Sequence, residues 1–150
     1  MSTAVVMDAA TGKITQQAVA PRALEEIRDA LFAALSNRRW QAETAGIVVG
    51  GAPIRTDRES QSVLTSAYVQ AMGNPDFSVR WKIGQGQFVT LNAATIIAIG
   101  DAVTAHVQAC FDHEDELTTA ILAAFAAGDR DALESFDIAA GWPGSTPPAP

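Results

Sequence analysis

The chain has 150 residues, 48% of them hydrophobic, and a single cysteine, Cys110. This length favours one domain with a core of its own, and one cysteine excludes a fold held together by internal disulfides. The net charge of −7 is uneven: residues 1–82 carry nine Lys/Arg and eight Asp/Glu, whereas residues 83–150 carry one Arg and nine Asp/Glu. An acidic half repels phosphate backbones, so we expect no nucleic-acid partner.

Residues 1–20 form an N-terminal segment that precedes the main domain. The pattern predicts a strand over 4–7 and a second over 14–19, joined by a turn that contains Gly12. A two-stranded hairpin is marginally stable alone. We therefore expect this hairpin to lean on the body of the protein or on another chain.

A helix is predicted from about Pro21 to Glu43. Proline suits a first helical turn, and acidic residues near the start with Arg38 and Arg39 near the end complement the helix dipole. The apolar face of this helix comprises Leu24, Ile27, Leu31, Ala34 and Leu35. Its spacing fits a face packed on the chain's own core, and it also fits a short self-association seam.

A short hairpin over residues 47–56 and a second helix are predicted next. Gly50 and Gly51 suit the turn between the two strands. Asp57 or Thr56 is a candidate N-cap for the helix, whose apolar residues recur at helical spacing. The sequence from Gly73 to Asp76 is typical of a helix stop.

The stretch from Trp81 to Phe111 is the one around which we expect the rest of the chain to be organised. Alternating residues predict strands over 80–83 and 88–91, with Trp81 and Phe88 on the packed face. Asn92 is a candidate N-cap for the most apolar helix of the chain. Asp101 interrupts its apolar run, which favours a buried helix over a membrane span.

The C-terminal third is predicted to be helical before a tail rich in Pro, Gly and Ser. We expect the long helix to break at Asp112, although it could also run through with a bend. A further short helix is predicted over 129–137, and within the 141–150 tail only Trp142 is expected to be anchored. The predicted fold is α+β and helix-dominated, with about four helices and two or three short hairpins, in a single domain over residues 21–140.

Motifs for catalysis are absent from the sequence, and one weak metal pattern is present. His106, Cys110 and His113 stand at i, i+4 and i+7, where they can share a helix face and offer zinc ligands. The first two also fall on the apolar stripe, where a thiol behaves as a small hydrophobe. We therefore expect packing residues, no cofactor and no enzymatic activity, with a metal-dependent activity as a remote alternative.

Basic and aromatic residues form the other candidate site. They are Arg38, Arg39, Trp40, Arg55, Arg58, Arg80, Trp81 and Lys82. Such a group can bind an acidic partner or the acidic half of the same chain, or it can be an ordinary salt-bridged surface. Together with Leu24, Ile27, Leu31 and the N-terminal hairpin, it makes up the predicted partner-binding surface.

The order of several short motifs over residues 38–126 resembles a known family. The matching elements are Arg39-Trp40 before Gly46-Ile47, then Ile54, Thr56-Asp57, Ser60, Trp81, Gly86, Leu91, His106, Cys110-Phe111 and Glu114. The chain resembles a domain of unknown function that is common in tailed-phage and prophage tail proteins. The residues before it, from Val5 to Ile14, look like the leaders that precede that domain.

The resemblance implies a phage or prophage tail protein, often encoded beside tail-fibre genes, and it brings no catalytic residues. We expect a structural or adaptor module at the tail tip or fibre, made in the bacterial host cytoplasm and located in the virion. Its partners would be other tail proteins and further copies of itself, in a homo-oligomer or symmetric assembly, with no membrane. The alternative is an assembly chaperone for the tail fibre that binds transiently.

Overall fold

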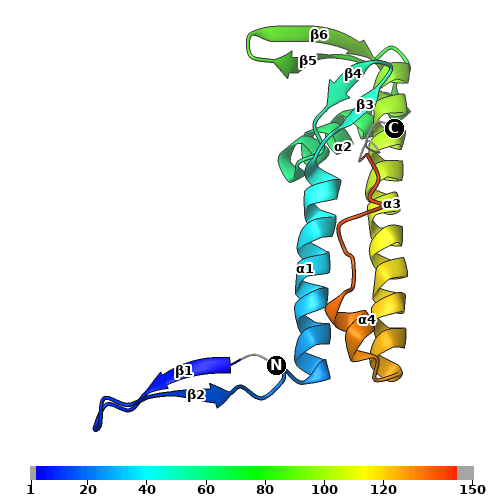
Figure 1. The fold of residues 1–150 in the computed structure, drawn as a ribbon. Helices are drawn as coiled ribbons and strands as arrows, with labels where there is room; N and C mark the ends of the chain where they lie inside the picture. Colours follow the sequence, from blue (N-terminus) through cyan, green and yellow to red (C-terminus); the bar gives the residue numbers. More distant parts are fainter. Residues whose placement is uncertain (1–2, 145–150) are drawn as a thin grey trace, which may run out of the picture.

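The computed structural model describes residues 3–144 and shows a rod with a head at one end and a projecting arm at the other (Figure 1). Two long helices, α1 (Leu24–Thr44) and α3 (Ala93–Ala126), lie antiparallel and form the rod. The arm is the hairpin of β1 (Thr3–Met7) and β2 (Ile14–Ala18). This architecture confirms the predicted helix-dominated α+β fold.

The rod has a hydrophobic core that α1 and α3 share with the C-terminal segment. Leu35, Cys110, Ile121 and Leu133 are almost fully buried in it. Leu133 belongs to the short helix α4 (Arg130–Glu134), which is shorter than the predicted 129–137. Beyond α4 the chain turns back toward the head, and Trp142, 2% exposed, closes this core as predicted.

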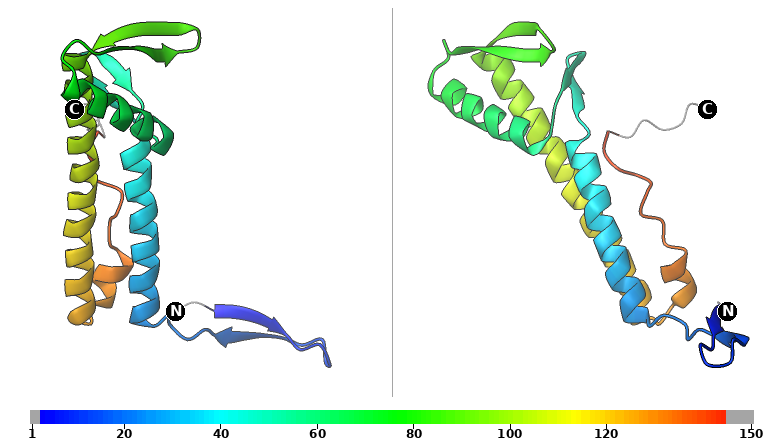
Figure 2. Two further views of the ribbon diagram at one scale, coloured as in Figure 1. Left: turned by 180° about the vertical axis from the view of Figure 1, so that it is seen from behind. Right: turned by 90° about the vertical axis from the view of Figure 1, so that its left-hand side faces the viewer.

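The head has a separate core built on the first half of α3. Ile96, Ile99 and Val103 pack against Leu64 and its neighbours on α2 (Arg58–Gly73). Two hairpins complete the head: β3 (Ile47–Val49) with β4 (Ala52–Ile54), and β5 (Ser78–Gly84) with β6 (Gln87–Asn92). Figure 2 shows these elements gathered around the upper end of α3.

Capping side chains begin α2 and α3 as the sequence predicts. Asp57 accepts a hydrogen bond from the Ser60 amide at 3.0 Å, and its pKa is lowered, chiefly by this bond. Asn92 accepts from the Thr95 amide at 2.9 Å. Each cap satisfies a first-turn amide that has no partner within the helix.

The prediction that Phe88 shares the packed face of the β5–β6 hairpin with Trp81 is wrong. In the observed register, Trp81 is opposite Val89, and Phe88 is opposite Lys82. Residues directly opposite in an antiparallel pair share a face, so Val89 lies with Trp81 toward the core while Phe88 faces away. Phe88 is accordingly 57% exposed.

The predicted helix break at Asp112 is also wrong, because α3 runs without interruption from Ala93 to Ala126. Asp112 does not cap a new helix; it accepts a side-chain hydrogen bond from Gln108, one turn earlier, at 2.8 Å. Cys110 and Ile121, on either side of the expected break, are both fully buried in the same rod core. Packing along α1 therefore keeps the helix continuous.

Helix α3 is long and apolar enough to cross a membrane, by length and composition alone. A core helix meets the same criterion. In this structure α3 packs against α1 along the rod and against α2 in the head. These contacts are those expected of a central core helix.

Gly100 on α3 packs directly against the Tyr68 ring of α2. A methyl group at Gly100 would lie 2.3 Å from Cδ2 of the Tyr68 ring. We expect Gly100→Ala to destabilise the protein by about 1–3 kcal/mol through overpacking. In a Tyr68→Ala background the same change should stabilise, because alanine is the better helix former. Chemical denaturation of the four proteins measures this reversal, and equal effects in both backgrounds would contradict it.

Candidate functional site

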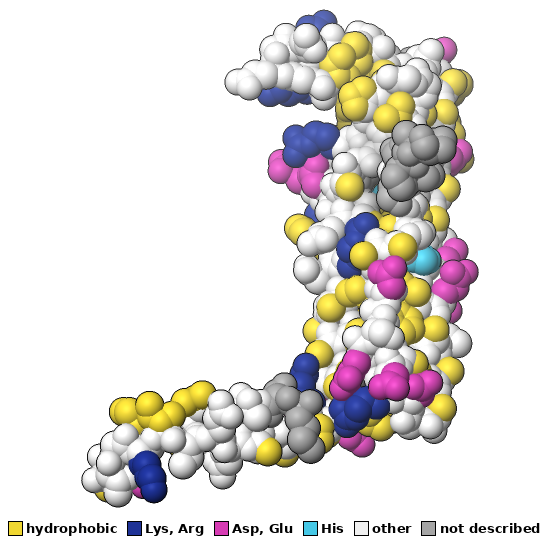
Figure 3. All heavy atoms as spheres, viewed as in Figure 1, with side chains coloured by type: hydrophobic (Ala, Val, Ile, Leu, Met, Phe, Trp, Pro, Cys, Tyr) yellow, Lys and Arg dark blue, Asp and Glu magenta, His cyan; other side chains and the backbone are white. Residues whose placement is uncertain are grey.

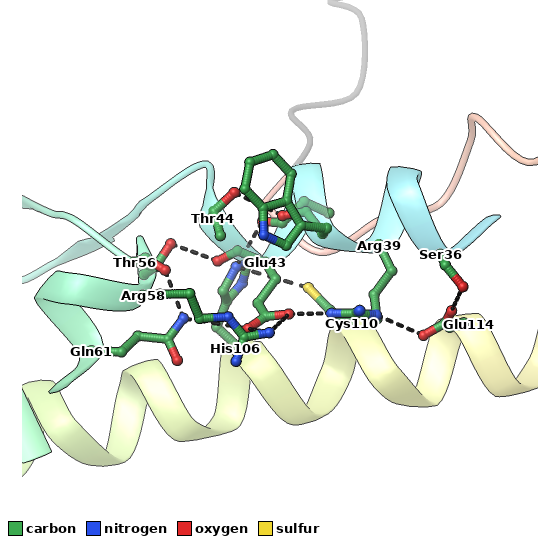
Figure 4. A network of polar contacts seen from close by, with 12 residues as sticks. Ser36, Arg39, Glu43, Thr44, Thr56, Arg58, Gln61, His106, Cys110 and Glu114 are labelled. Carbon is green, nitrogen blue, oxygen red and sulfur yellow. Dashed lines mark hydrogen bonds and ion pairs between the residues drawn. The ribbon is translucent and has the colours of Figure 1, made fainter. Parts of the chain in front are cut away.

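The polar centre of the molecule lies where the head meets the rod, at Glu43 in the last turn of α1. Its side chain is fully buried. A buried carboxylate is costly unless charged and hydrogen-bonding partners surround it. Figure 4 shows that α1, α2 and α3 all contribute to the polar contacts at this junction.

Three side chains satisfy the Glu43 carboxylate. Arg39, one turn earlier on α1, forms an ion pair with it. Arg58, at the start of α2, places Nη2 3.0 Å from Oε1, and Gln61 donates to the same oxygen at 3.4 Å. Glu43 therefore ties the first turn of α2, in the head, to α1, in the rod.

Arg39 extends the network to α3. Its Nε lies 2.7 Å from Oε2 of Glu114, in an ion pair whose angle does not make a hydrogen bond. Ser36 donates to the other Glu114 oxygen at 3.1 Å. The guanidinium also lies over the Phe111 ring, 4.4 Å from its centroid. Arg39 thus bridges two carboxylates and connects α1 with α3.

Thr56 supports the junction from the loop between β4 and α2. Its fully buried hydroxyl donates to the Glu43 carbonyl at 2.6 Å and accepts from the Gly46 amide at 2.9 Å. Gly46 has a φ of +92°, which favours glycine. The turn after α1 is thereby fixed to the start of α2.

The three candidate metal ligands do not converge. His106 Nε2 lies 3.0 Å from the Ala42 carbonyl and 3.8 Å from Cys110 Sγ. A carbonyl only accepts, so this nitrogen carries a proton and has no lone pair for a metal. His113 instead contacts the Ala140 carbonyl at 3.0 Å and the edge of Trp142. Among residues 3–144, no group of three His, Cys, Asp or Glu side chains has metal-binding geometry.

Cys110 is placed as a core residue. It has no exposed surface, and burial raises the pKa of its thiol, with a smaller contribution from nearby Glu43. A raised pKa leaves little of the reactive thiolate at neutral pH. We therefore expect Cys110 to react with iodoacetamide at pH 7.5 at least about a hundredfold more slowly in the native protein than in urea. Mass spectrometry measures both rates, and comparable rates would contradict the buried placement.

The predicted basic-aromatic group divides into two parts. Arg39 and Arg58 belong to the junction, and Arg38 lies over Trp142, 5.3 Å from the ring centroid. These side chains therefore bind residues of their own chain. Trp40, half exposed on α1, takes part in neither of the two parts.

The second part surrounds an open hollow of about 680 Å³ between α2 and the two head hairpins. Arg55, Arg80, Trp81, Lys82 and Phe88 line it, together with Glu59 and smaller residues. Arg55 is 80% exposed and pairs with Asp57 at 3.0 Å. Of the predicted basic-aromatic group, only the residues around this hollow remain available for an acidic partner, and binding of such a partner stays a prediction.

Four of the five residues of the predicted α1 face belong to the rod core, whereas the fifth, Ala34, is exposed. Ile27 is 7% exposed, and Leu24 and Leu31 pack against the same cluster. Within one chain these residues pack on the rod core, and the self-association seam stays a prediction. Ile27 and Leu31 also reach the wall of an open groove near the root of the arm.

Glu43 and Gln61 are the site residues that the sequence reasoning missed. One signal was available, because Glu43 stands four residues after Arg39, a spacing that places opposite charges together on a helix. The contribution of Gln61 has no local signal. It depends on how α2 docks beside the end of α1.

The fold and its junction define a helix-dominated α+β protein in which a buried ion network joins head and rod. A model of a domain of unknown function, DUF4376, matches residues 26–140, and the chain belongs to this family. The arm lies outside the matched residues. No curated protein and no solved structure matches the chain.

Proposed function

We propose that the chain is a non-enzymatic bacteriophage tail protein, a structural adaptor at the tail tip or tail fibre. The phage context rests on the motif resemblance over residues 38–126. The observation that supports an adaptor role is the arm, which projects from one end of the rod while the head occupies the other end (Figures 1 and 2). An adaptor needs two separate surfaces that can be engaged together.

The arm has the properties of an assembly element. Its strands pair only with each other, so each keeps an open edge. Val5, Met7 and Ile14 are each about two-thirds exposed. Exposed apolar side chains on an element without its own core favour contact with another protein surface.

The junction supports the same role by fixing the head to the rod. Ion pairs and hydrogen bonds from α1, α2 and α3 converge on Glu43 and Arg39. Buried charge networks of this kind hold elements in one arrangement. A fixed arrangement keeps the start of α1, where the arm is attached, and the basic hollow of the head at a constant separation, as an adaptor requires.

Complementation of a deletion tests this proposal. In a phage or prophage that encodes the chain, deleting its gene should give particles that lack the tail tip or fibre in electron micrographs. The full chain supplied in trans should restore the structure, and a chain lacking residues 1–18 should not. A head-only change at an exposed site, Val69→Ser, serves as the control that should restore it. Normal particles from the deletion would contradict the proposal.

An assembly chaperone would produce the same deletion phenotype but would be absent from finished particles. The exposed apolar arm is compatible with such transient binding. Immunogold labelling of intact particles separates the two roles. Label at the tail supports the adaptor, and its absence from normal, complemented particles would favour the chaperone.

A further inference from the structure

Three of the four large apolar residues of the arm hairpin lie on one face; the fourth, Val6, is 44% exposed on the other face. The register pairs Met7 with Ile14 and Val5 with Gln16, and these two pairs share a face of the hairpin because they are two residues apart. Val5, Met7 and Ile14 are 67%, 67% and 66% exposed. Figure 3 shows hydrophobic side chains gathered along the upper side of the arm. This surface, the arm face, consists of Val5, Met7 and Ile14.

An apolar groove opens at the root of the same arm. It has a volume of about 830 Å³ and lies between the arm's connection to α1, the first turns of α1, and α4. We call it the root groove; its lining residues are Val19, Ala20, Pro21, Arg22, Ile27, Ala30, Leu31, Leu133 and Glu134. Seven of these nine residues are apolar, so a matching apolar surface would be buried there favourably.

The charges beside the two surfaces are complementary. Asp8 and Lys13 flank the arm's turn. The Asp8 amide donates to the Lys13 carbonyl at 3.0 Å, and the Gly12 amide donates to the Asp8 carbonyl at 2.8 Å. Arg22 and Glu134 line the root groove. An arm that enters the groove would bring Asp8 toward Arg22, and Lys13 toward Glu134, which in the single chain pairs with Arg130 at 3.0 Å. Exposed pairs add little affinity, but they select one orientation over its reverse.

We propose that the arm face of one copy binds in the root groove of a second copy, and that two copies exchange arms reciprocally. This inference deepens the proposed function, because it names the partner of the arm. Every copy carries both the arm face and the root groove at the same end of the rod, so one two-fold axis at that end satisfies both contacts. The arm extends away from its own rod in Figure 1 and in the left view of Figure 2, which leaves its own groove open.

The mass of the full chain in solution is the first test. Light scattering should give twice the chain mass at micromolar concentration. Met7→Asp together with Ile14→Asp should raise the dissociation constant at least about a hundredfold, because two apolar side chains lose their burial. Ala30→Glu, at an exposed position of the groove, should act in the same direction. Ala98→Glu, at an exposed position of α3 in the head, is the matched control and should leave the mass unchanged.

Crosslinking distinguishes an arm that binds the root groove of a second copy from an arm that binds the groove of its own chain. Cys110 is buried, so an introduced surface cysteine is the reactive one. Mixing Val5→Cys chains with Ala30→Cys chains and a short bismaleimide should join position 5 to position 30, a link that is interchain by construction. A monomeric mass for the full chain would overturn the proposal. So would a 5–30 link found only within single chains of the double variant.

These results are independent of the phage role. A monomer that is nevertheless labelled at the tail would overturn arm exchange and leave the adaptor proposal standing. Arm exchange in the purified protein, combined with normal particles after gene deletion, would overturn the adaptor proposal alone. The two failures therefore have separate signatures.

Discussion

Replacing Glu43 with alanine is expected to lower the free energy of unfolding by about 3–5 kcal/mol. The change removes the shared partner of Arg39 and Arg58 at the junction. Arg58 is 63% exposed and can return to water, but the Arg39 side chain is only 14% exposed and keeps Glu114 alone. The penalty therefore arises mainly from a cation left under-compensated inside the protein.

Chemical denaturation followed by circular dichroism measures this effect. Glu116→Ala is the matched control, because Glu116 is 77% exposed and its one charged contact is with His113 at 3.6 Å. Exposed pairs of this kind contribute about 0–1 kcal/mol. If the two alanine variants lost similar stability, the buried network would not be holding the head on the rod.

Trp142→Ala is expected to destabilise the protein by a similar amount, about 3–5 kcal/mol. The indole is 2% exposed and closes the rod core beside Arg38 and His113. Its Nε1 donates to the Ile138 carbonyl at 2.8 Å within the returning C-terminal segment, and the packed ring attaches that segment to the rod. Removing the ring leaves a cavity and frees that segment from the rod.

Trp40→Ala provides the comparison for this variant. Trp40 is half exposed on α1, so its removal should cost well under half as much. Thermal unfolding of both variants gives the ranking. A Trp142 variant as stable as the Trp40 variant would mean that the C-terminal segment does not pack on the rod.

Local signals predicted the elements of this fold well. The caps Asp57 and Asn92 act through side-chain bonds to amides three residues later, so they are visible in the sequence itself. The turns behave similarly, since Gly50, Gly51 and Gly86 all take positive φ. Element type and order follow from such short-range chemistry.

Two errors of the sequence reasoning come from long-range packing and register. Asp112 has the residue type of an N-cap, but α1 packs along α3 on both sides of it and holds the helix straight. Phe88 is an aromatic residue of the kind that favours strands, and it does lie in β6. An irregularity between Lys82 and Gly84 shifts the register, however, so that Phe88 pairs with Lys82 and faces outward. Neither packing nor register can be read from neighbouring residues.

The candidate site was only partly accessible from sequence for the same reason. Arg39 and Arg58 were identified, but their shared acceptor, Glu43, is buried only once α2 docks through Arg58 and Gln61. The arm hairpin was predicted correctly, but of its two expected supports, the body and another chain, the structure of residues 3–144 does not show the first. Its projection from the rod follows from tertiary structure, since none of its strands pairs with the body.

Quantitative mass spectrometry of purified phage or prophage particles addresses the proposed role as a tail component. The adaptor proposal predicts the chain in the particles at a fixed small-number ratio to the major tail protein. The arm-exchange proposal adds that the number of copies of this chain in each particle is even. Absence of the chain from particles, together with its presence in infected or induced cells, would contradict a structural role.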